Sequence, residues 1–449
     1  MLKKISFYIL LICLSLLGIV IAAIAPIDDT PYQQLPCQAQ SKKAIDDFQA
    51  TVIQAHTGFE IGWGQANITP TKPTELVGYG LNRYGKPTTE VHDSLFVRTL
   101  LIGNQQKNVA IVSFDLLFVS EELAAAVRER VRRVFPTLQY VYFSATHTHH
   151  SFGGWSGSGL ASRFLLGGLQ TQVLDGLVQQ TIEALLIAHR QQQKATMTYQ
   201  EVYAPTQIHN RVADNAPKDA YLRYFYCKNQ SNEEAIWVTY AAHNTVMPVE
   251  KIAFSNDYVG LLLQKLTSNV KFSIFTAGMV GSHNLYCERA NISDIQPCAN
   301  ALADSILKHK SIQEVQNVGQ LRFGDVPIAL RSPQLRIAEG WRLRPWLFEV
   351  LMGKVQPYMS FLQINDTKLI GMPCDFSGEL MPDIQALRDI KNPLCITSFN
   401  GSYIGYVSHD RHYEGLIHEK QNYEIRDMNW FMPQEGSYFT WLVAQLAAK

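Results

Sequence analysis

The chain has 449 residues and is balanced in charge, with 39 Lys and Arg against 39 Asp and Glu. This balance, with no basic run, excludes an electrostatic surface for nucleic acid, and 20 Tyr and 21 Phe exclude a disordered chain. The globular part is longer than the roughly 250 to 300 residues of a usual single core. We therefore expect one large layered domain or two fused subdomains.

The chain begins with an apolar stretch, Ile5 to Ala25, which contains no charged residue and follows Lys3 and Lys4. Its length suits a membrane-spanning helix, whereas a cleaved signal peptide has a shorter apolar region. Ala23-Ile24-Ala25 resembles a cleavage box, but processing tolerates the following Pro26 poorly, so we expect an uncleaved anchor. The positive-inside rule then places the remaining chain on the extracytoplasmic side, in the periplasm or outside the cell.

Predicted helices and strands alternate along the remaining chain. A helix is expected around Ile45 to Ala55, and a first strand within residues 56–64. A buried strand at 109–114, an amphipathic helix at 121–134 and a strand at 140–144 form a crossover unit, which implies parallel pairing. Further strands are predicted at 196–203, 221–227, 235–242, 271–275, 361–371 (a pair) and 394–398, and helices at 170–190, 257–266, 299–308, 380–388 and 437–448. The sequence therefore predicts a mixed α/β fold with mixed β-sheets flanked by helices.

Six cysteines follow the apolar stretch, and their spacing fits neither a zinc ribbon nor a CxxC redox site. In an exported protein they can form up to three disulfides. Cys287 and Cys298 are the favoured local pair, while the remaining connectivity is left open by the sequence.

The densest cluster of reactive side chains is Thr146-His147-Thr148-His149-His150, directly after the predicted strand that ends at Ser144. If the extended conformation continues, the two-residue period of a strand points His147 and His149 to the same face. Taken alone, the motif is equally compatible with a polar loop whose histidines are solvated or bonded to backbone.

His243 and Asp375 also follow predicted strands, and each taken alone is better explained as a capping or core residue. Together with the histidine cluster, they give two histidines and a carboxylate at the ends of three strands. Two histidines, one carboxylate and an open position make a ligand set of zinc hydrolases. We therefore predict a metal site at the carboxyl ends of strands.

An ordered set of short motifs runs from residue 58 to the C-terminal part of the chain. The set resembles the N-terminal catalytic domain of the neutral/alkaline non-lysosomal ceramidase family. Its members here are Gly64 to Pro70, Gly78 to Gly80, Val91 to Asp93, Phe96 to Arg98, Thr146 to His149, Gly153-Gly154, His209 to Arg211, His243 to Thr245, Ser255 to Gly260, Pro373 to Phe376, Asn400 to Val407, Tyr413 and Tyr423-Glu424.

The resemblance implies a zinc-dependent amidohydrolase that cleaves an N-acyl bond, which in the best-known family members releases a fatty acid from a sphingoid base. It implies that zinc-activated water attacks the amide. Carried over by position, the metal ligands are His147, His243, Asp375 and Tyr406, with Tyr403 as the alternative tyrosine; His149 is a supporting or catalytic histidine and Arg211 a polar substrate contact.

Three features depart from the family pattern. Asp375 stands where the family usually has Glu, which keeps a carboxylate but shortens its reach. Aligning Gly281 with the family glycine places Ser282 at an Asp position and Asn284 at the position of the catalytic Ser. We therefore favour water over a serine nucleophile, with Ser282 as the alternative nucleophile, Asn284 as an oxyanion donor and His283 as a residue within reach. The chain also stops before the C-terminal β-sandwich of typical members.

These observations divide the chain into a signal anchor or signal peptide (1–27), a juxtamembrane segment and helix (28–57) and a ceramidase-like catalytic domain (58–449). The expected function is zinc-dependent hydrolysis of an N-acyl amide, most plausibly of a lipid, by a protein held at the membrane through its N-terminal helix. A zinc esterase or small-amide hydrolase, and a ceramidase-like binding protein without catalysis, remain alternatives. The sequence leaves the protein partners, like the physiological substrate, undetermined.

Overall fold

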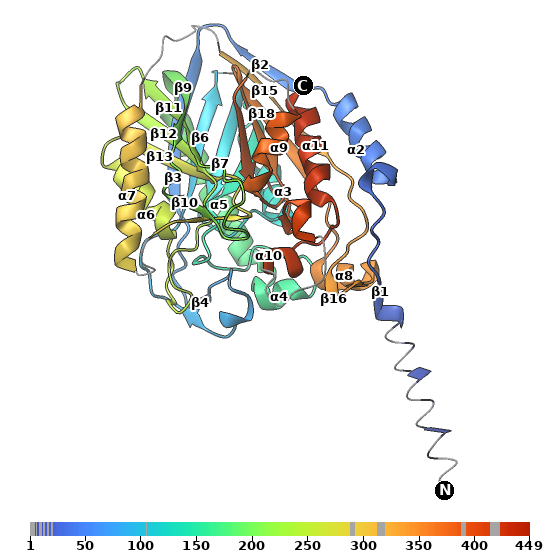
Figure 1. Cartoon of the computed structure of the whole chain (residues 1–449). Helices are drawn as coiled ribbons and strands as arrows, with labels where there is room; N and C mark the ends of the chain where they lie inside the picture. Colours follow the sequence, from blue (N-terminus) through green and yellow to red (C-terminus); the bar gives the residue numbers. More distant parts are fainter. Residues whose placement is uncertain are drawn as a thin grey trace.

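The computed structural model describes residues 21–104, 106–287, 292–311, 319–387, 392–413 and 423–449, together with isolated positions before residue 21. Two β-sheets form the centre of the molecule, and helices lie on both sides of them (Figure 1).

The larger sheet has eight strands in the order β13-β12-β11-β9-β3-β6-β7-β8. Two pairs, β7 with β8 and β12 with β13, are parallel, and the other neighbours are antiparallel. The strands are β3 (Phe59–Asn67), β6 (Phe96–Gly103), β7 (Asn108–Phe114), β8 (Leu138–Ala145), β9 (Gln193–Tyr203), β11 (Tyr221–Asn229), β12 (Glu234–Tyr240) and β13 (Phe272–Ala277).

The smaller sheet has five strands in the order β2-β15-β18-β19-β21, of which only β19 and β21 are parallel neighbours. These strands are β2 (Thr51–Ala55), β15 (Gly319–Pro327), β18 (Tyr358–Ile364), β19 (Thr367–Met372) and β21 (Leu394–Ser398). Side chains from both sheets, among them Trp63, Leu100, Leu321 and Leu362, form one buried apolar layer between them.

Helices cover the two outer faces and complete a four-layer α/β/β/α arrangement. The large sheet carries α3 (Glu121–Val134), α5 (Thr171–Arg190), α6 (Asp257–Thr267) and α7 (Ile292–His309), and the small sheet carries α2 (Pro36–Asp47), α9 (Met381–Ala386) and α11 (Glu435–Ala447). Helix α5 lies so close to β3 that a Cβ atom at Gly62 would stand 2.0 Å from the carbonyl oxygen of Ala188. Glycine at this position is therefore a packing requirement.

Short elements gather at one end of the sheets. Strand β1 (Ile24–Pro26) pairs with a hairpin formed by β16 (Arg336–Ala338) and β17 (Trp341–Leu343). The other short pairs are β4 (Thr74–Glu75) with β5 (Pro87–Thr88), β10 (Ile208–Asn210) with β14 (His283–Leu285), and β20 (Asp375–Phe376) with β22 (Tyr406–Val407). Short helices complete the structure: η1 (Tyr32–Gln34), η2 (Gly80–Asn82), α4 (Ala161–Leu165), α8 (Pro345–Met352), η3 (Gly378–Leu380), η4 (Asp410–Tyr413) and α10 (Tyr423–Arg426).

The mixed α/β fold predicted from the sequence is confirmed. Strand β7, helix α3 and strand β8 form the expected crossover with parallel strands. Helix α3 begins where predicted because Ser120 caps it by accepting from the amide of Leu123. The disulfide between Cys287 and Cys298 is also confirmed, with the two Cα atoms 6.2 Å apart.

The predicted helix at Ile45 to Ala55 is wrong in its position. Helix α2 lies earlier, with Pro36 in its first turn, and ends at Asp47. Residues 51–55 instead form β2, because Val52 and Ile53 are β-branched and the segment pairs with residues 319–323 of β15. The part of the chain assigned to a juxtamembrane segment therefore contributes a strand to the small sheet.

The predicted membrane anchor at Ile5 to Ala25 lies mostly outside the described residues. Within the residues that the structure describes, we find no helix with the length and apolar character needed to cross a membrane.

Candidate metal centre

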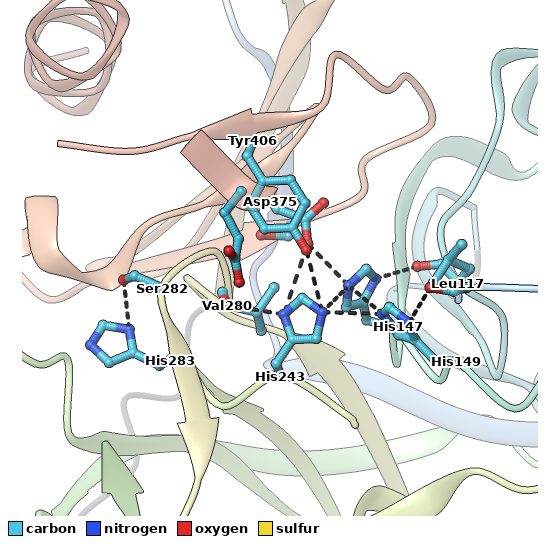
Figure 2. A network of polar contacts seen from close by, with 12 residues as sticks. Leu117, His147, His149, His243, Val280, Ser282, His283, Asp375 and Tyr406 are labelled. Atoms are coloured by element: carbon cyan, nitrogen blue, oxygen red, sulfur yellow. Dashed lines mark hydrogen bonds and ion pairs between the residues drawn. The ribbon is translucent and has the colours of Figure 1, made fainter. Parts of the chain in front are cut away.

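Four side chains that the sequence places after strands meet at one end of the molecule. His147 and His149 follow β8, His243 follows β12, and Asp375 follows β19 and begins β20. The first two strands belong to the large sheet and β19 to the small one, so the group lies across both sheets (Figure 2). The structure therefore brings these residues together at the carboxyl ends of strands.

The three imidazole rings point their Nε2 atoms at one another. Nε2 of His147 lies 2.8 Å from Nε2 of His243 and 3.3 Å from that of His149, and His149 and His243 are 3.1 Å apart. All three side chains are buried. Three nitrogens bound to one tetrahedral zinc at 2.0–2.1 Å would be about 3.3–3.4 Å apart, so the observed separations suit a shared ion.

Backbone carbonyl groups fix the other nitrogen of each ring. Nδ1 of His147 donates to the carbonyl of Leu117 (2.6 Å), that of His149 to Gly78 (2.7 Å) and that of His243 to Val280 (3.2 Å). A carbonyl oxygen can only accept, so Nδ1 of His147 and of His149 carries the hydrogen and their Nε2 atoms present lone pairs; Nδ1 of His243 also lies 3.3 Å from Nη2 of Arg211, which can only donate. Nε2 lone pairs that face one another repel unless a cation or a proton lies between them, and metal-binding histidines are held by such bonds at the other ring nitrogen.

The electrostatic surroundings keep the rings of His149 and His243 uncharged. Burial and the neighbouring His147 hold the pKa of His149 well below its ordinary value. Burial and the positive charge of Arg211 do the same for the pKa of His243. Neutral imidazole is the form that binds metal.

Asp375 adds a carboxylate to the group and is fully buried. Its Oδ1 lies 3.0 Å from Nε2 of His147 and has no hydrogen-bond partner among the described residues. Its Oδ2 accepts a hydrogen bond from the hydroxyl of Tyr403 at 2.8 Å. A buried carboxylate oxygen without a donor, facing a nitrogen lone pair, fits the coordination of a cation.

The rings of His147 and His149 meet for a different reason from the one expected. Strand β8 ends at Ala145, and His147 adopts a left-handed backbone conformation with φ of 61°. The extended conformation therefore does not continue, and the kink at His147, not the two-residue period of a strand, turns both rings inward. His149, which the resemblance makes a supporting or catalytic residue, brings its Nε2 into the same group.

Tyr406 and Arg211 lie beside the histidines. The Tyr406 hydroxyl is 3.5 Å from Nε2 of His243, 3.4 Å from Nη2 of Arg211 and 3.3 Å from the hydroxyl of Tyr423. Burial and Asp375 raise the pKa of Tyr406 well above its ordinary value, so this hydroxyl stays protonated. Nε of Arg211 pairs with Oε1 of Glu424 at 2.8 Å. Sequence reasoning assigned no role to Tyr423 or Glu424, although both belong to the motifs behind the resemblance.

The loop with the uncertain nucleophile contacts His243 through its backbone, since the His243 amide donates to the carbonyl of His283 at 2.9 Å, but the side chains of Ser282 and His283 point elsewhere. The Ser282 side chain is fully buried; its Oγ is 2.7 Å from Oγ of Ser377 and 3.2 Å from Nδ1 of His283 (Figure 2). The His283 ring lies against Gly378, on the side away from the three histidines. Asn284 lies in β14 opposite His209. Among the described residues, neither the Ser282 hydroxyl nor the His283 ring contacts the three histidines.

A cavity of about 540 Å³ opens onto the group. His147, His149, Tyr406 and Tyr423 form its polar end. Much of its remaining wall is apolar, including Leu117, Phe118, Leu165, Leu166, Met352, Val355 and Trp430. His243 and Asp375 do not line it, which places them behind His147 and His149.

Comparisons with known proteins agree with this description. Residues 59–261, somewhat less than half of the chain, match the family model described as neutral/alkaline non-lysosomal ceramidase, N-terminal. A crystal structure of neutral ceramidase from Pseudomonas aeruginosa is similar in fold, with a TM-score of 0.72 and 16% identity over 87% of this chain and 74% of that one. A structure described as ceramidase complexed with C2 is similar to the same degree (TM-score 0.72, 15% identity, 87% and 75% covered). The curated proteins contain no significant sequence match.

Proposed function

Because residues 59–261 belong to the neutral/alkaline non-lysosomal ceramidase family, we propose that the protein is a zinc-dependent amidohydrolase that cleaves the N-acyl bond of a lipid. One observation carries the proposal: three buried Nε2 atoms and a carboxylate oxygen with no hydrogen-bond donor among the described residues converge next to a largely apolar cavity, which two of the imidazole rings line. The donors suit zinc, and the apolar walls suit an acyl chain.

We assign His147, His243 and Asp375 as the metal ligands. Catalytic zinc sites usually keep three protein ligands and one open position. His147 Nε2 is the central donor, since it contacts both His243 Nε2 and Asp375 Oδ1. The Tyr406 hydroxyl lies 3.5 Å from Nε2 of His243 and would supply a fourth donor when substrate is absent.

His149 is then the general base. It lines the cavity, and its Nε2 lies 3.3 Å from Nε2 of His147 and 3.1 Å from Nε2 of His243. The bond from its Nδ1 to Gly78 leaves Nε2 with a lone pair that can take a proton from water. When bound, Zn²⁺ would polarise the amide carbonyl and lower the pKa of water at its open position.

Tyr406 and Tyr423 supply hydrogen bonds to the amide oxygen as its negative charge grows, and Arg211, which does not line the cavity, supports them through its Nη2, 3.4 Å from the Tyr406 hydroxyl. The two tyrosine hydroxyl groups lie 3.3 Å apart at the cavity wall. Arg211 adds a positive charge that Glu424 balances and orients. Donors held in place before the reaction stabilise an oxyanion without reorganisation. Ser282 and Asn284 take no direct part in this proposal, because neither lines the cavity.

We also propose that Ile5 to Ala25 anchors the protein in a membrane with the hydrolase on the extracytoplasmic side, as its uncharged length and the two preceding lysines favour. N-terminal sequencing of the mature protein tests this. A mature chain that starts at or near Pro26 would overturn the anchor.

The function is tested with purified protein, metal analysis and a matched pair of substrates: an N-acyl amide and the corresponding ester. The proposal expects about one equivalent of zinc and hydrolysis of the amide. His147→Ala should lose both metal and activity, whereas His149→Ala should retain metal and lose activity. His209→Ala, outside the metal group, is the control. Hydrolysis of the ester alone would make the protein an esterase, and bound zinc with no turnover would make it a binding protein.

A further inference from the structure

Exposed apolar side chains gather around the mouth of the cavity. They come from η2 and the loop after it, from α4 and from α8, and we call them the rim face: Leu81, Tyr84, Phe164, Trp346 and Val350. Their exposed fractions are 69%, 51%, 52%, 53% and 46%. A cluster of large apolar side chains that remains this exposed marks a surface for a partner or a membrane.

The three elements adjoin one another. The rings of Tyr84 and Phe164 are 5.8 Å apart, which joins η2 to α4. The amide of Leu160, which precedes α4, donates to the carbonyl of Val350 in α8 at 3.0 Å. The rim face is therefore one surface.

The same elements form walls of the cavity. Asn82 of η2, Ala161 and Leu165 of α4, and Met352 of α8 all line it. One side of each element faces the cavity while the other exposes the rim face. Whatever covers the rim face therefore also lies against the entrance to the proposed active site.

The N-terminal apolar stretch leaves the molecule at this surface. Residues 24–26 pair with β17, which directly precedes α8. The indole Nε1 of Trp346 donates to the carbonyl of Ala22 (2.9 Å), and Nε of Arg344 donates to that of Ile21 (2.8 Å). Figure 1 labels β1, β16, α8 and α4 along the end of the molecule at which the N-terminus departs.

We propose that the rim face docks on a lipid bilayer and turns the cavity mouth toward it. The uncharged stretch Ile5 to Ala25 is about long enough to span a bilayer and is continuous with the rim face through residues 21–26. Trp, Tyr, Phe and Leu are the side chains that settle at the boundary of headgroups and acyl chains. The bilayer contact rests on these observations, whereas entry of a lipid amide from the bilayer rests on the proposed function.

Tryptophan quenching tests the contact without any reference to activity. The full chain is reconstituted in phosphatidylcholine vesicles whose acyl chains carry bromine, which quenches nearby indoles. Part of the fluorescence should be quenched, and that part should be smaller in Trp346→Phe, in which the half-exposed Trp341 beside Pro26 is still present. Trp441→Phe, in α11 on the outer side of the small sheet, is the matched control and should leave the quenched part intact. Equal quenching in the two variants would overturn the proposal, as would self-association through the rim face without quenching.

A second variant separates docking from catalysis. Phe164→Ser with Val350→Ser changes only the rim face and should lower hydrolysis of a vesicle-embedded N-acyl lipid several-fold. Hydrolysis of a short, water-soluble N-acyl amide should stay at the wild-type rate. Equal loss on both substrates would contradict a docking role. If neither substrate is hydrolysed by the wild-type protein, the proposed function fails while the quenching result still decides the bilayer contact.

Discussion

Tyr403 donates its hydroxyl hydrogen to Oδ2 of Asp375 over 2.8 Å, which leaves Oδ1 as the carboxylate oxygen that faces His147. Asp375 is shorter than a Glu by one methylene, so its position depends strongly on its own backbone and on this bond. The backbone is fixed because Asp375 pairs with Tyr406 in the two-stranded sheet of β20 and β22. Tyr403 therefore orients the Asp375 carboxylate, and Asp375 remains the assigned metal ligand.

Tyr403→Phe should weaken zinc binding about 10- to 100-fold without removing the site, because loss of a partner behind a ligand typically has this effect. The affinity is measured by competition with a chelator of known strength. Tyr203→Phe removes an exposed hydroxyl and should leave the affinity unchanged. Loss of all zinc from Tyr403→Phe would instead indicate that Tyr403 is itself a ligand.

Glu424→Gln should lower the free energy of unfolding by about 3–5 kcal/mol, because it leaves the buried charge of Arg211 without its carboxylate. The pair is nearly inaccessible to solvent, with 13% and 3% of the two side chains exposed. Urea unfolding measures the change. Asp47→Asn breaks the exposed pair with Lys43 and should leave the free energy of unfolding nearly unchanged. Similar stability of both variants would show that solvent reaches Arg211.

Ser282→Ala should retain most of the turnover, because the Ser282 hydroxyl is buried against Ser377 and His283 and does not line the cavity. We expect a loss of stability of about 1 kcal/mol for the hydrogen bonds removed. Burst kinetics with an activated acyl substrate should show no accumulating acyl-enzyme. Loss of activity with zinc retained, or a burst, would restore a serine mechanism.

Stability should rise between about pH 4 and pH 6.5, in part because of His283. Burial lowers the pKa of His283 to about 4, so in this range the unfolded chain binds a proton that the folded protein does not. The folded state therefore gains stability as pH rises, by at most about 3 kcal/mol for this residue. His283→Gln should flatten the pH dependence of unfolding, and His56→Gln, at an exposed position, should not. Unchanged slopes in His283→Gln would show that the ring is accessible to water.

Much of the fold could be read from the sequence because its signals are local. Residues 121–134 carry a capping serine and an amphipathic pattern, and the flanking strands are continuous apolar runs. Residues 51–55 were assigned to a helix because their strand partner, residues 319–323, is far away in the chain. Pairing at that distance leaves no mark on the local pattern.

The candidate site, like the fold, could be predicted from the sequence only in part. The positions of His147, His243 and Asp375 after strands could be predicted, because each follows an apolar run. The left-handed turn at His147 could not, since it depends on the carbonyl of Leu117 and on the packing around it. The direction of the Ser282 side chain could not be predicted either. Its hydrogen-bond partner, Ser377, comes from a segment far away in the sequence, directly after β20.

The positions of the donor residues along the chain also determine how much of the chain is needed to form the site. Residues 59–261 contain His147, His149 and His243, but Asp375, Tyr403 and Tyr406 come from later in the sequence. An ion shared by His147 and Asp375 would close a chain loop between the two sheets and so link segments made at different times during synthesis. The family-matched segment alone holds the imidazoles of a metal centre and lacks its carboxylate, so the complete site exists only after the small sheet has joined the large one.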